Sequence, residues 1–532
     1  MEQLFIGIDV GSASVRAGIY TAEGVRLAFS IRPIFQFHSG ENFVEQSSAD
    51  IWQQVCVTVR EAVILAKVDA AQIASIGFDA TCSLVAVGKR GEPISVAHSD
   101  QAEHDIIMWM DHRAGQETQR INATQDPALQ YVGGRVSIEM QLPKILWLKT
   151  HYPERYQTVW RFFDLADYLV WRASGADAAS ICTLTCKWNY LAHEARFSHS
   201  LLDAINLTEV TEKIPPRIVN IGESVGHLQT DVAQQLGLST AVVIASGMID
   251  AHAGGLALVA EQPQGNLALI SGTSNCHMII SQDAKYVPGV WGPYYGAMYP
   301  GWWLNEGGQS AAGALVEWTL HQSEHWDALN DDATARGCSP YTLLNERVAH
   351  LEKEEPYPTQ QLHVLGDHHG NRSPRADATL KGMVAGLTLE SSPLQLTRLY
   401  LATLQAIAYG TRHIIDTMEA NGQKVVTLTL CGGASKNPLW LREYANATGR
   451  KIHLVAEEDA VTLGAALTGA VACGAFINLS VAAQHMVRPD RTIEPNNTHR
   501  AFHDAKYQVY LQMYQDQQQY QSLMNSCLTL ND

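Results

Sequence analysis

Residues 241–260, AVVIASGMIDAHAGGLALVA, are mostly small or apolar and carry one acid, Asp250. A buried carboxylate without a partner is costly, so it should either be neutralised by a partner or lie at the mouth of a cleft. Gly247, Gly254 and Gly255 favour tight turns and close packing over a membrane span. The stretch therefore presents a single carboxylate, and its chemistry depends on what faces it.

A second acid begins a turn rich in glycine and serine, DVGSASVR, residues 9–16. Asp9 ends an apolar run, and residues 11–14 offer closely spaced N–H and hydroxyl donors. Such donors suit phosphate oxygens, a carboxylate at a strand end suits Mg²⁺, and Arg16 would add a cation. The alternative is an ordinary hairpin turn. The turn is not a Walker A loop, because no G-x-x-x-x-G-K-[ST] occurs in the chain.

Two later turns have a similar composition. SGTSN, residues 271–275, again joins two apolar runs and would bind the same phosphate chain. CGGASKNPLW, residues 431–440, leads from a strand through two glycines into a helix start, where partial positive charge favours an anionic ligand. Each of these turns alone is more often a packing feature than a binding site.

One mixed stretch suits a polyhydroxylated ligand. WMDHRA, residues 109–114, offers an indole for stacking beside a carboxylate and a guanidinium for hydroxyl groups. The alternative is a surface ion pair next to a core tryptophan. GDHHGNRSP, residues 366–374, is interpreted as a polar loop rather than a metal site, because adjacent histidines rarely face one ion.

Composition limits the function classes. The chain has 532 residues, 46% hydrophobic and 17% charged, which predicts at least two globular domains. Its 54 acidic and 37 basic residues give a net charge of −17, which argues against nucleic-acid and anionic-membrane partners. Nine cysteines are scattered without C-x-x-C or paired zinc-type spacing, so reduced thiols in a cytoplasmic protein are expected. Neither a signal peptide nor a transmembrane run is recognised.

The apolar periodicity indicates a duplicated α/β architecture. The chain opens with three strands, at LFIGIDV, VRAGIYT and VRLAFSI, followed by a helix that begins near Ser47 and Asp50. Residues 265–281 again predict strand, polar turn and strand. Helices are predicted after Asn437 and over 457–472, and a helix ends the chain. The boundary between the two halves is placed near residues 250–265.

Taken in order, these motifs resemble the FGGY carbohydrate kinases of the actin-like ATPase superfamily over residues 4–475. GIDVGSASVRAG and ISGTSNC resemble the phosphate loops, IDAHAGG the catalytic segment, and CGGASKNPLW and EEDAVTLGAAL the nucleotide end. FDATCSL, EGGQSAAG and HGNRSP are similar to the ribulokinase branch, and FDATCSL to D-ribulokinases in particular. The resemblance implies two actin-like (ribonuclease H-like) domains flanking a deep cleft, at 1–260 and 261–490, with a helical tail at 491–532.

The resemblance also implies residue roles. Asp250 matches the general base and also a sugar contact, and Asp9 matches the Mg²⁺-associated aspartate. Ala13 departs from relatives that carry a hydroxyl residue there, so Ser12 and Ser14 are the expected loop contacts. Phosphate and nucleotide contacts are expected at Ser12, Ser14, Arg16, Gly272, Thr273, Gly313, Gly433 and Asn437. Sugar contacts are expected at Cys82, Trp109, Asp111, Arg113, Lys187 and Glu306, although Lys187 would also fit a snorkelling lysine.

The expected activity is transfer of the γ-phosphoryl group of ATP, with Mg²⁺, to the terminal hydroxyl of a ketopentose, D-ribulose first. L-ribulose, a pentitol or another small ketose or polyol is the near alternative. A nucleotide switch like actin or a chaperone, and a catalytically silent sugar-binding relative, are alternatives from other classes. The partners expected are the sugar and ATP, with a homodimer suggested by the family alone.

Overall fold

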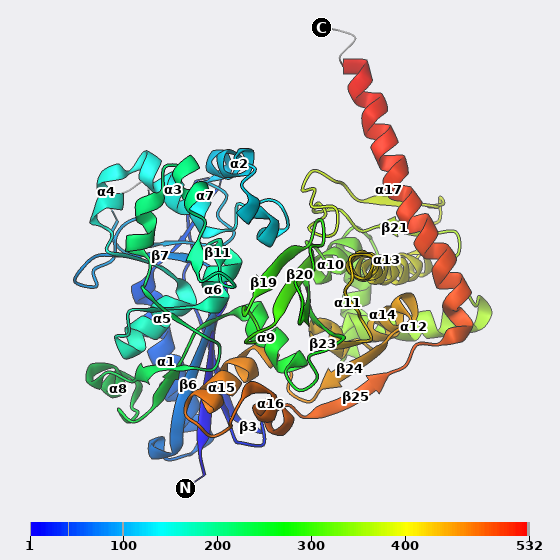
Figure 1. The fold of residues 1–532 in the computed structure, drawn as a ribbon. Coiled ribbons are helices and arrows are strands. Elements are labelled where there is room, and N and C mark those ends of the chain that lie inside the picture. The colour runs from blue at the N-terminus through cyan, green and yellow to red at the C-terminus, as the bar shows by residue number, and fades with distance from the viewer. Residues whose placement is uncertain (1, 41, 98–100, 529–532) are drawn as a thin grey trace. The chain divides into compact units, whose positions relative to one another are not determined.

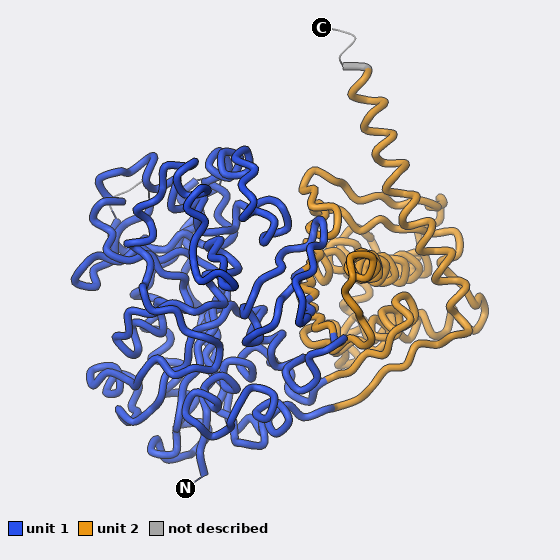
Figure 2. Tube along the Cα trace, viewed as in Figure 1, with its two compact units in different colours: residues 1–266, 278–306, 455–489 blue, residues 267–277, 307–454, 490–532 orange. Residues whose placement is uncertain are grey.

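The structure is a computed structural model that describes residues 2–40, 42–97 and 101–528. The chain forms mixed α/β structure and divides into two compact units, coloured in Figure 2. Unit 1 comprises residues 1–266, 278–306 and 455–489, and unit 2 comprises 267–277, 307–454 and 490–532. The two compact units therefore differ from the linear division of the chain at residue 260. Two later segments belong to unit 1, and the tail belongs to unit 2.

Unit 1 is built on a seven-stranded sheet of order β14-β15-β6-β1-β2-β3, with β16 also paired to β6 (Figure 1). The three predicted opening strands are confirmed as β1 (Leu4–Val10), β2 (Ser14–Tyr20) and β3 (Arg26–Pro33). The other strands are β6 (Ile73–Ala80), β14 (Ser224–His227), β15 (Val243–Ala245) and β16 (Met248–Ile249). Strands β1, β15 and β16 each run parallel to β6, so their carboxyl ends meet at one edge.

Helices cover the two faces of this sheet because successive side chains point to opposite sides. On one face Ile6 and Ile8 join a hydrophobic core with Val55 and Val59 of helix α1 (Ser48–Ala66). On the other face Gly7 and its register partner Gly77 lie against the backbone of helix α15 (Ala460–Ala472). Helix α15 also packs against helix α9 (Asp250–Val259).

A second sheet of unit 1 has the order β4-β5-β8-β7-β9. Its strands are β4 (Phe37–Gly40), β5 (Phe43–Gln46), β8 (Ile106–Ile107), β7 (Leu84–Val87) and β9 (Arg161–Asp164). Helix α6 (Ile181–Lys187) and strand β19 (Trp291–Tyr295) complete the elements that carry site residues in this unit.

Unit 2 contains adjacent strands in the order β18-β17-β23-β24-β25. They are β18 (Asn275–Ser281), β17 (Asn266–Ser271), β23 (Thr427–Gly432), β24 (Lys451–Val455) and β25 (Pro489–Ile493). The ends of β17, β18 and β20 (Trp303–Gln309) are shared between the units along the chain. Its main helices are α10 (Gly313–His321), α12 (Pro340–Glu354), α13 (Pro393–Ala420) and α14 (Pro438–Thr448).

The chain closes with helix α17 (Arg500–Leu528), whose first half is anchored to unit 2. Lys506 Nζ donates to the Thr359 carbonyl oxygen at 2.8 Å, and the Tyr409 hydroxyl lies 2.9 Å from His503 Nδ1. Figure 1 shows the last turns of α17 extending beyond the other elements of this unit.

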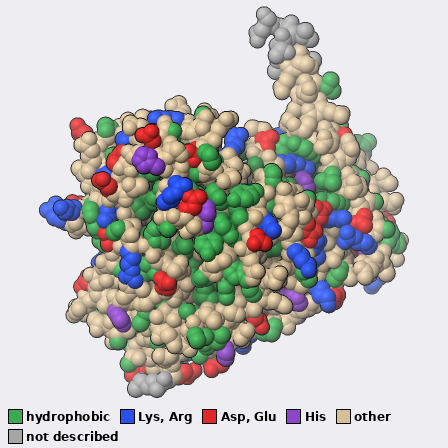
Figure 3. All heavy atoms as spheres, in the orientation of Figure 1, with side chains coloured by type: hydrophobic (Ala, Val, Ile, Leu, Met, Phe, Trp, Pro, Cys, Tyr) green, Lys and Arg blue, Asp and Glu red, His purple; other side chains and the backbone are tan. Residues whose placement is uncertain are grey.

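The surface of the face shown in Figure 3 carries acidic and basic side chains interspersed with one another. Among the described residues, no helix combines the length and the apolar character that a membrane crossing requires.

Candidate functional site

Three charged side chains meet at the carboxyl edge of the unit 1 sheet. Asp9 on β1 is the register partner of Arg16 on β2 and of Asp79 on β6, so one strand pairing places each neighbour beside it. Asp9 and Arg16 form an ion pair, and the side chain of Asp9 is fully buried. Arg16 also bonds to Asp459 at the start of α15, with Nη1 2.9 Å from Oδ2. One guanidinium therefore pairs with two carboxylates, Asp9 and Asp459, and acts on a third, Asp79, only through its charge.

The negative charge of the carboxylates at this edge of the sheet is only partly balanced by Arg16. Burial raises the pKa of Asp9 to about 7, against the lowering effect of Arg16. Burial also raises the pKa of Asp79 well above its ordinary value, and the charge of Asp9 adds to that effect. The four carboxylate oxygens of Asp9 and Asp79 are buried without a hydrogen-bond partner, although Asp9 pairs electrostatically with Arg16. Oxygen ligands with excess negative charge are what a divalent hard cation requires.

Asp250 follows directly where β16 ends beside β6, with Met248 and Ile249 in register with Asp79 and Ala80. It is the first residue of α9, and its Oδ1 accepts from the Ala251 N–H at 2.7 Å, which fixes the carboxylate. Burial raises the pKa of Asp250, and its charge in turn raises the pKa of Asp9 and of Asp79. The acid that the sequence singled out thus lies within electrostatic reach of the Asp9 group.

The glycines after Asp250 have a packing role. Gly254 and Gly255 lie inside α9 rather than in the turn that the sequence predicts. A Cβ at Gly255 would lie 2.7 Å from Met298 Sδ, and one at Gly464 of α15 would overlap the carbonyl oxygen of Ala253. Close approach of α9 and α15 therefore requires a residue without a side chain at Gly464, while Gly255 makes room for Met298.

The first loop, residues 11–14, is a closed turn in which the Gly11 N–H donates to the Ser14 carbonyl oxygen at 3.0 Å. Gln36 and Gln46 hold it from outside, since both side-chain amides donate to the Ser12 carbonyl oxygen. The Trp109 indole N–H donates to Ser12 Oγ at 2.9 Å. Trp109, expected to contact the sugar, is therefore attached to the loop expected to contact phosphate.

Lys187, Cys82 and Glu306 are buried together in unit 1. Lys187 ends α6, and its Nζ lies 4.5 Å from the centre of the Trp291 ring. Burial alone would lower the pKa of Lys187, but Cys82 and Glu306 next to it raise that pKa above its ordinary value. Burial raises the pKa of the Cys82 thiol to about 12. The group thus offers a fixed cation, a neutral thiol and a carboxylate to a polar ligand.

Asp111 and Arg113 have a different environment from the one expected of sugar contacts. Arg113 bonds to Asp111 Oδ2 and Glu45 Oε1, both at 2.7 Å, and donates to the Val96 carbonyl oxygen. Its guanidinium also stacks on the rings of Phe43 and Trp147. The side chains of Asp111 and Arg113 are fully buried, so their hydrogen bonds are made to other residues of the protein. We leave both out of the proposed sugar site and assign them to positioning the loop that carries Trp109.

A histidine next to the catalytic segment links Glu306 to two cysteines. His252 Nε2 lies 3.0 Å from Glu306 Oε2, and its Nδ1 lies 3.3 Å from Cys182 Sγ. Burial alone would raise the pKa of Cys182, but Cys186 and His252 bring it down to about 5. Burial likewise opposes the positive charge of His252, yet Cys182 and Glu306 raise its pKa to about 10. These contacts favour the thiolate form of Cys182 and the imidazolium form of His252, which is held against a carboxylate.

In unit 2 the second loop lies against the start of α10. The N–H of Gly313 donates to the Gly272 carbonyl oxygen at 3.0 Å, and the N–H groups of Ala312 and Ala314 both donate to Thr273. A Cβ at Gly313 would lie 2.7 Å from the Gly272 carbonyl oxygen. Gly272 and Thr273 are exposed. The predicted loop residues Gly272, Thr273 and Gly313 thus come together as one backbone-bonded turn.

Gly433 and Asn437, expected in the nucleotide pocket, lie on the segment between β23 and α14. Gly432 before them has φ of +92°, and a Cβ there would overlap the Ser271 carbonyl oxygen. Asn437 is the N-cap of α14: its Oδ1 accepts from the N–H groups of Leu439 and Trp440. Its Nδ2 donates to the Tyr400 hydroxyl at 2.7 Å. Asn437 therefore shapes the helix start, while a Cβ at Gly433 would make only an ordinary contact, 3.9 Å from the Ser271 carbonyl oxygen.

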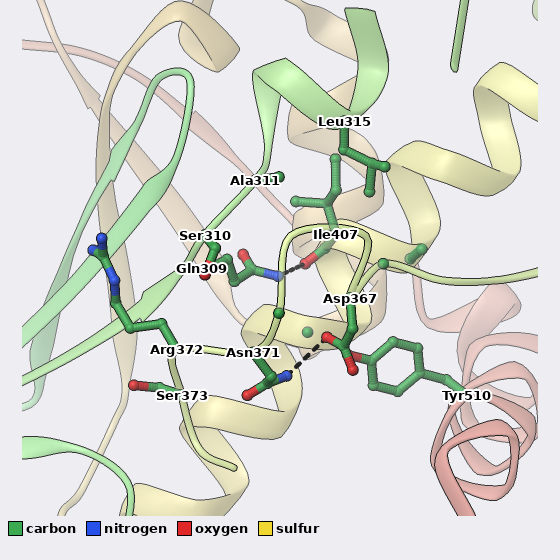
Figure 4. Close-up of a pocket in the computed structure, with 14 residues that line it drawn as sticks. Gln309, Ser310, Ala311, Leu315, Asp367, Asn371, Arg372, Ser373, Ile407 and Tyr510 are labelled. Atoms are coloured by element: carbon green, nitrogen blue, oxygen red, sulfur yellow. Dashed lines mark hydrogen bonds between the residues drawn. The ribbon is translucent and has the colours of Figure 1, made fainter. Parts of the chain in front are cut away.

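Figure 4 shows a polar pocket of unit 2 that is lined by residues of two motifs, EGGQSAAG and HGNRSP. Gln309 Nε2 donates to the Ile407 carbonyl oxygen at 3.0 Å, and Gln309 Oε1 accepts from Asn275 next to the second loop. Asn371 Nδ2 donates to Asp367 Oδ1 at 2.8 Å. The segment 366–374 has no helix and forms polar contacts, which confirms the predicted polar loop.

Three residues of these groups were not singled out from the sequence: Asp79, Asp459 and His252. Asp79 lies inside FDATCSL, and its position in register with Asp9 depends on parallel pairing of strands about 70 residues apart. Asp459 lies in EEDAVTLGAAL, and a capping aspartate before a helix was the available signal. His252 is two residues from Asp250, but neither Cys182 nor Glu306 is near it in the sequence.

The fold and these loops define a class of phosphotransferase, and comparison with known proteins identifies it. The N-terminal domain of the FGGY family of carbohydrate kinases matches residues 4–257, and its C-terminal domain matches residues 267–473. The chain belongs to the FGGY family of carbohydrate kinases, enzymes that transfer phosphoryl groups to sugars.

Individual relatives agree with this assignment. The chain is 43% identical to a human FGGY carbohydrate kinase domain-containing protein, over 98% of both chains. It is 35% identical to a D-ribulokinase of Saccharomyces cerevisiae, over 89% of this chain and 72% of the relative. A xylulose kinase structure from Rhodospirillum rubrum superimposes with a TM-score of 0.83 at 20% identity, covering 97% and 99% of the two chains. The fold is thus the two-domain actin-like ATPase fold expected from the sequence.

Proposed function

We propose that this protein is an ATP-dependent kinase that phosphorylates the terminal hydroxyl of a ketopentose, D-ribulose first. The observation that carries the proposal is Asp250, fixed at the start of α9 beside the Asp9, Asp79 and Arg16 group. The D-ribulokinase relative supports the choice of sugar. The buried Lys187 and Glu306 favour a polar substrate over a nucleotide switch, which has no need of a sugar pocket.

Asp250 would accept the proton of the attacking hydroxyl. Phosphoryl transfer passes through a loose transition state, so the protein mainly positions the reactants and stabilises charge. The raised pKa of Asp250 makes it a better base, provided that it remains ionised at the working pH. The Ala251 N–H holds one carboxylate oxygen and so directs the other.

Asp9 and Asp79 would hold Mg²⁺, because their buried oxygens lack hydrogen-bond partners and share one guanidinium. When bound, the ion would neutralise charge on the phosphate oxygens. Burial raises the pKa of both carboxylates, and Arg16 opposes this by favouring their ionised forms. In unit 1 the turn at 11–14 would donate N–H groups to phosphate oxygens. In unit 2 the turn at 272–273 and the residues around Gly433 are the candidate nucleotide contacts.

Lys187, Glu306 and Cys82 would bind the sugar hydroxyls, with Trp109 closing the site from the first loop. Ser12, bonded to Trp109, would couple sugar binding to phosphate binding. The homodimer and the cytoplasmic location stay predictions.

The test is ADP release with purified protein, ATP and Mg²⁺ across D-ribulose, L-ribulose, D-xylulose, ribitol and glycerol. We expect the highest kcat/KM with D-ribulose. Asp250→Asn should lower kcat by about 10³-fold, the range of a lost general base, while the Kd for ATP changes little. Asp203→Asn, at an exposed position on the same unit, is the matched control. Full activity of Asp250→Asn would remove it from the mechanism, and a preference for another sugar would overturn the substrate assignment.

A further inference from the structure

Cys182, Cys186 and His252 form a cluster whose ligand atoms all lie within 4.8 Å of one another. Cys182 and Cys186 are four residues apart on α6, which places both sulfurs on one face of the helix. His252 lies on α9 and directs Nδ1 between them, 3.3 Å from Cys182 Sγ and 3.8 Å from Cys186 Sγ. At most 1% of each side chain is exposed.

We propose that these three residues bind a zinc ion. Zinc bonds of about 2.3 Å to sulfur and 2.0–2.1 Å to nitrogen, at tetrahedral angles, put sulfur and nitrogen ligands about 3.6 Å apart. The two measured sulfur–nitrogen distances, 3.3 and 3.8 Å, lie on either side of that value. Two thiolates and one imidazole form a neutral site with a divalent ion, so the buried charge is compensated. A water would take the fourth position.

The residues that contact the three proposed ligands also fit a metal site. A zinc-bound histidine usually donates its other ring N–H to a carboxylate, which fixes the tautomer and the ring. Here His252 Nε2 lies 3.0 Å from Glu306 Oε2, so the same arrangement leaves Nδ1 for the ion. The Ile249 N–H donates to Cys182 Sγ at 3.5 Å, as expected for a thiolate acceptor.

Ion binding has a defined proton balance. The ion takes both sulfurs as thiolates and Nδ1 as an unprotonated nitrogen. Any proton on these three atoms is released to water as two bonds to sulfur and one to nitrogen form. No oxidant is required. A dithiol–disulfide pair is disfavoured because exchange reagents would have to reach sulfurs that are fully buried.

The site would position Glu306 for the sugar. The ion fixes the ring of His252, and His252 holds one carboxylate oxygen of Glu306. This consequence rests on the proposed sugar site, whereas metal binding itself does not. Loss of the ion should therefore raise the KM for the sugar more than the KM for ATP.

The first experiment measures metal content by mass spectrometry of the full-length protein, purified without chelator. We expect about one zinc per chain in the wild type and in Cys56→Ala, which changes a buried cysteine of α1 that is not part of the cluster. Cys182→Ala/Cys186→Ala should retain less than about a tenth of this. Zinc in the double variant equal to that of the wild type would overturn the proposal.

A second measurement does not depend on the variants folding. The wild type, stripped with a chelator, is titrated with Co²⁺ and with zinc against a coloured competitor. Tetrahedral Co²⁺ with thiolate ligands gives a sulfur-to-cobalt charge-transfer band and intense visible bands. Zinc binding should raise the Tm of the stripped protein. Stripped protein that shows neither the band nor a Tm shift would leave a thiolate–imidazolium pair as the correct description. A protein lighter by two hydrogens with a Cys182–Cys186 disulfide would likewise overturn it. If sugar phosphorylation fails while zinc binds, only the proposed function is wrong.

Discussion

At the scale of residues, the site contains more buried carboxylates than the one neighbouring cation, Arg16, can neutralise. Asp9, Asp79 and Asp459 surround Arg16, and the pKa values of Asp9 and Asp79 are both raised by burial. Such clusters are stable when a ligand supplies the missing charge. Functional sites often carry this kind of local destabilisation.

Replacement of Asp79 should separate activity from stability. Asp79→Asn removes a buried charge facing Asp9, so the free energy of unfolding should stay level or rise. If Asp79 holds Mg²⁺, kcat should fall and the Mg²⁺ concentration for half-maximal rate should rise about tenfold or more. Urea unfolding and a Mg²⁺ titration of the rate check both, with Asp203→Asn as control. Unchanged Mg²⁺ dependence would exclude Asp79 as a ligand.

The pH dependence of stability should reflect Asp164, which is fully buried on β9 and has a pKa raised by burial to about 7. Because the folded state binds this proton more tightly than the unfolded chain, the free energy of unfolding falls between about pH 4 and pH 7. Asp164→Asn keeps an oxygen for the Gln141 and Trp188 donors. The variant should gain stability at pH 8, by at most about 4 kcal/mol, and less at pH 5. Urea midpoints at both pH values measure this, and an equal gain at both would contradict it.

At the scale of elements, local patterning predicted much of the fold. Alternating apolar runs and turn residues located β1–β3, β17–β18 and α14, because each is a local hairpin or a capped helix. Ser47 indeed accepts from the Asp50 N–H at the start of α1. The Asp50 carboxylate accepts from the Phe35 N–H.

The unpredicted part of the site arises from long-range register. Asp79 lies beside Asp9 only because β6 pairs in parallel with β1. Asp459 reaches Arg16 only because α15 packs on the same sheet. Asp111 and Arg113 were assigned to the sugar because their types suit hydroxyl groups. The sequence contains no signal that Glu45 pairs with Arg113, since that contact spans 68 residues.

A substitution that adds one methyl group, Gly464→Ala, tests the contact between α9 and α15. Gly464→Ala would overlap the Ala253 carbonyl oxygen, so the helices must separate. We expect destabilisation of about 1–3 kcal/mol together with a lower kcat, because α9 carries Asp250. Gly115→Ala, whose Cβ would meet only Ile138 Cδ1 at 3.8 Å, is the control and should be neutral or stabilising. Urea unfolding and initial rates report the two effects, and an unaffected Gly464→Ala would refute tight packing here.

At the scale of the whole molecule, each unit depends on segments that are distant in the sequence. The sequence predicted a linear succession of domains and a helical tail at 491–532. That tail contributes contacts to unit 2, namely the partly exposed Arg412–Asp504 ion pair at 2.7 Å and the buried bonds of Lys506 and His503.

Truncation should therefore depend sharply on position. A chain ending at residue 499 loses the partners of Tyr409 and Arg412, so its Tm should fall by several degrees. A chain ending at residue 521 loses, among the residues whose exposure is described, only the exposed ones at 522–526, and it should keep its Tm. Differential scanning calorimetry of the two compares them directly, and equal Tm values would show that the α17 contacts contribute little.

The three-segment composition of unit 1 has a consequence for biosynthesis. Helix α15, which covers β1 and β6, leaves the ribosome only after almost the whole chain has been made. Until then the glycine-lined face of the nascent sheet has no permanent cover. Chaperone engagement should accordingly persist through most of translation, and an expressed fragment of residues 1–260 should aggregate unless residues 455–489 are supplied in trans.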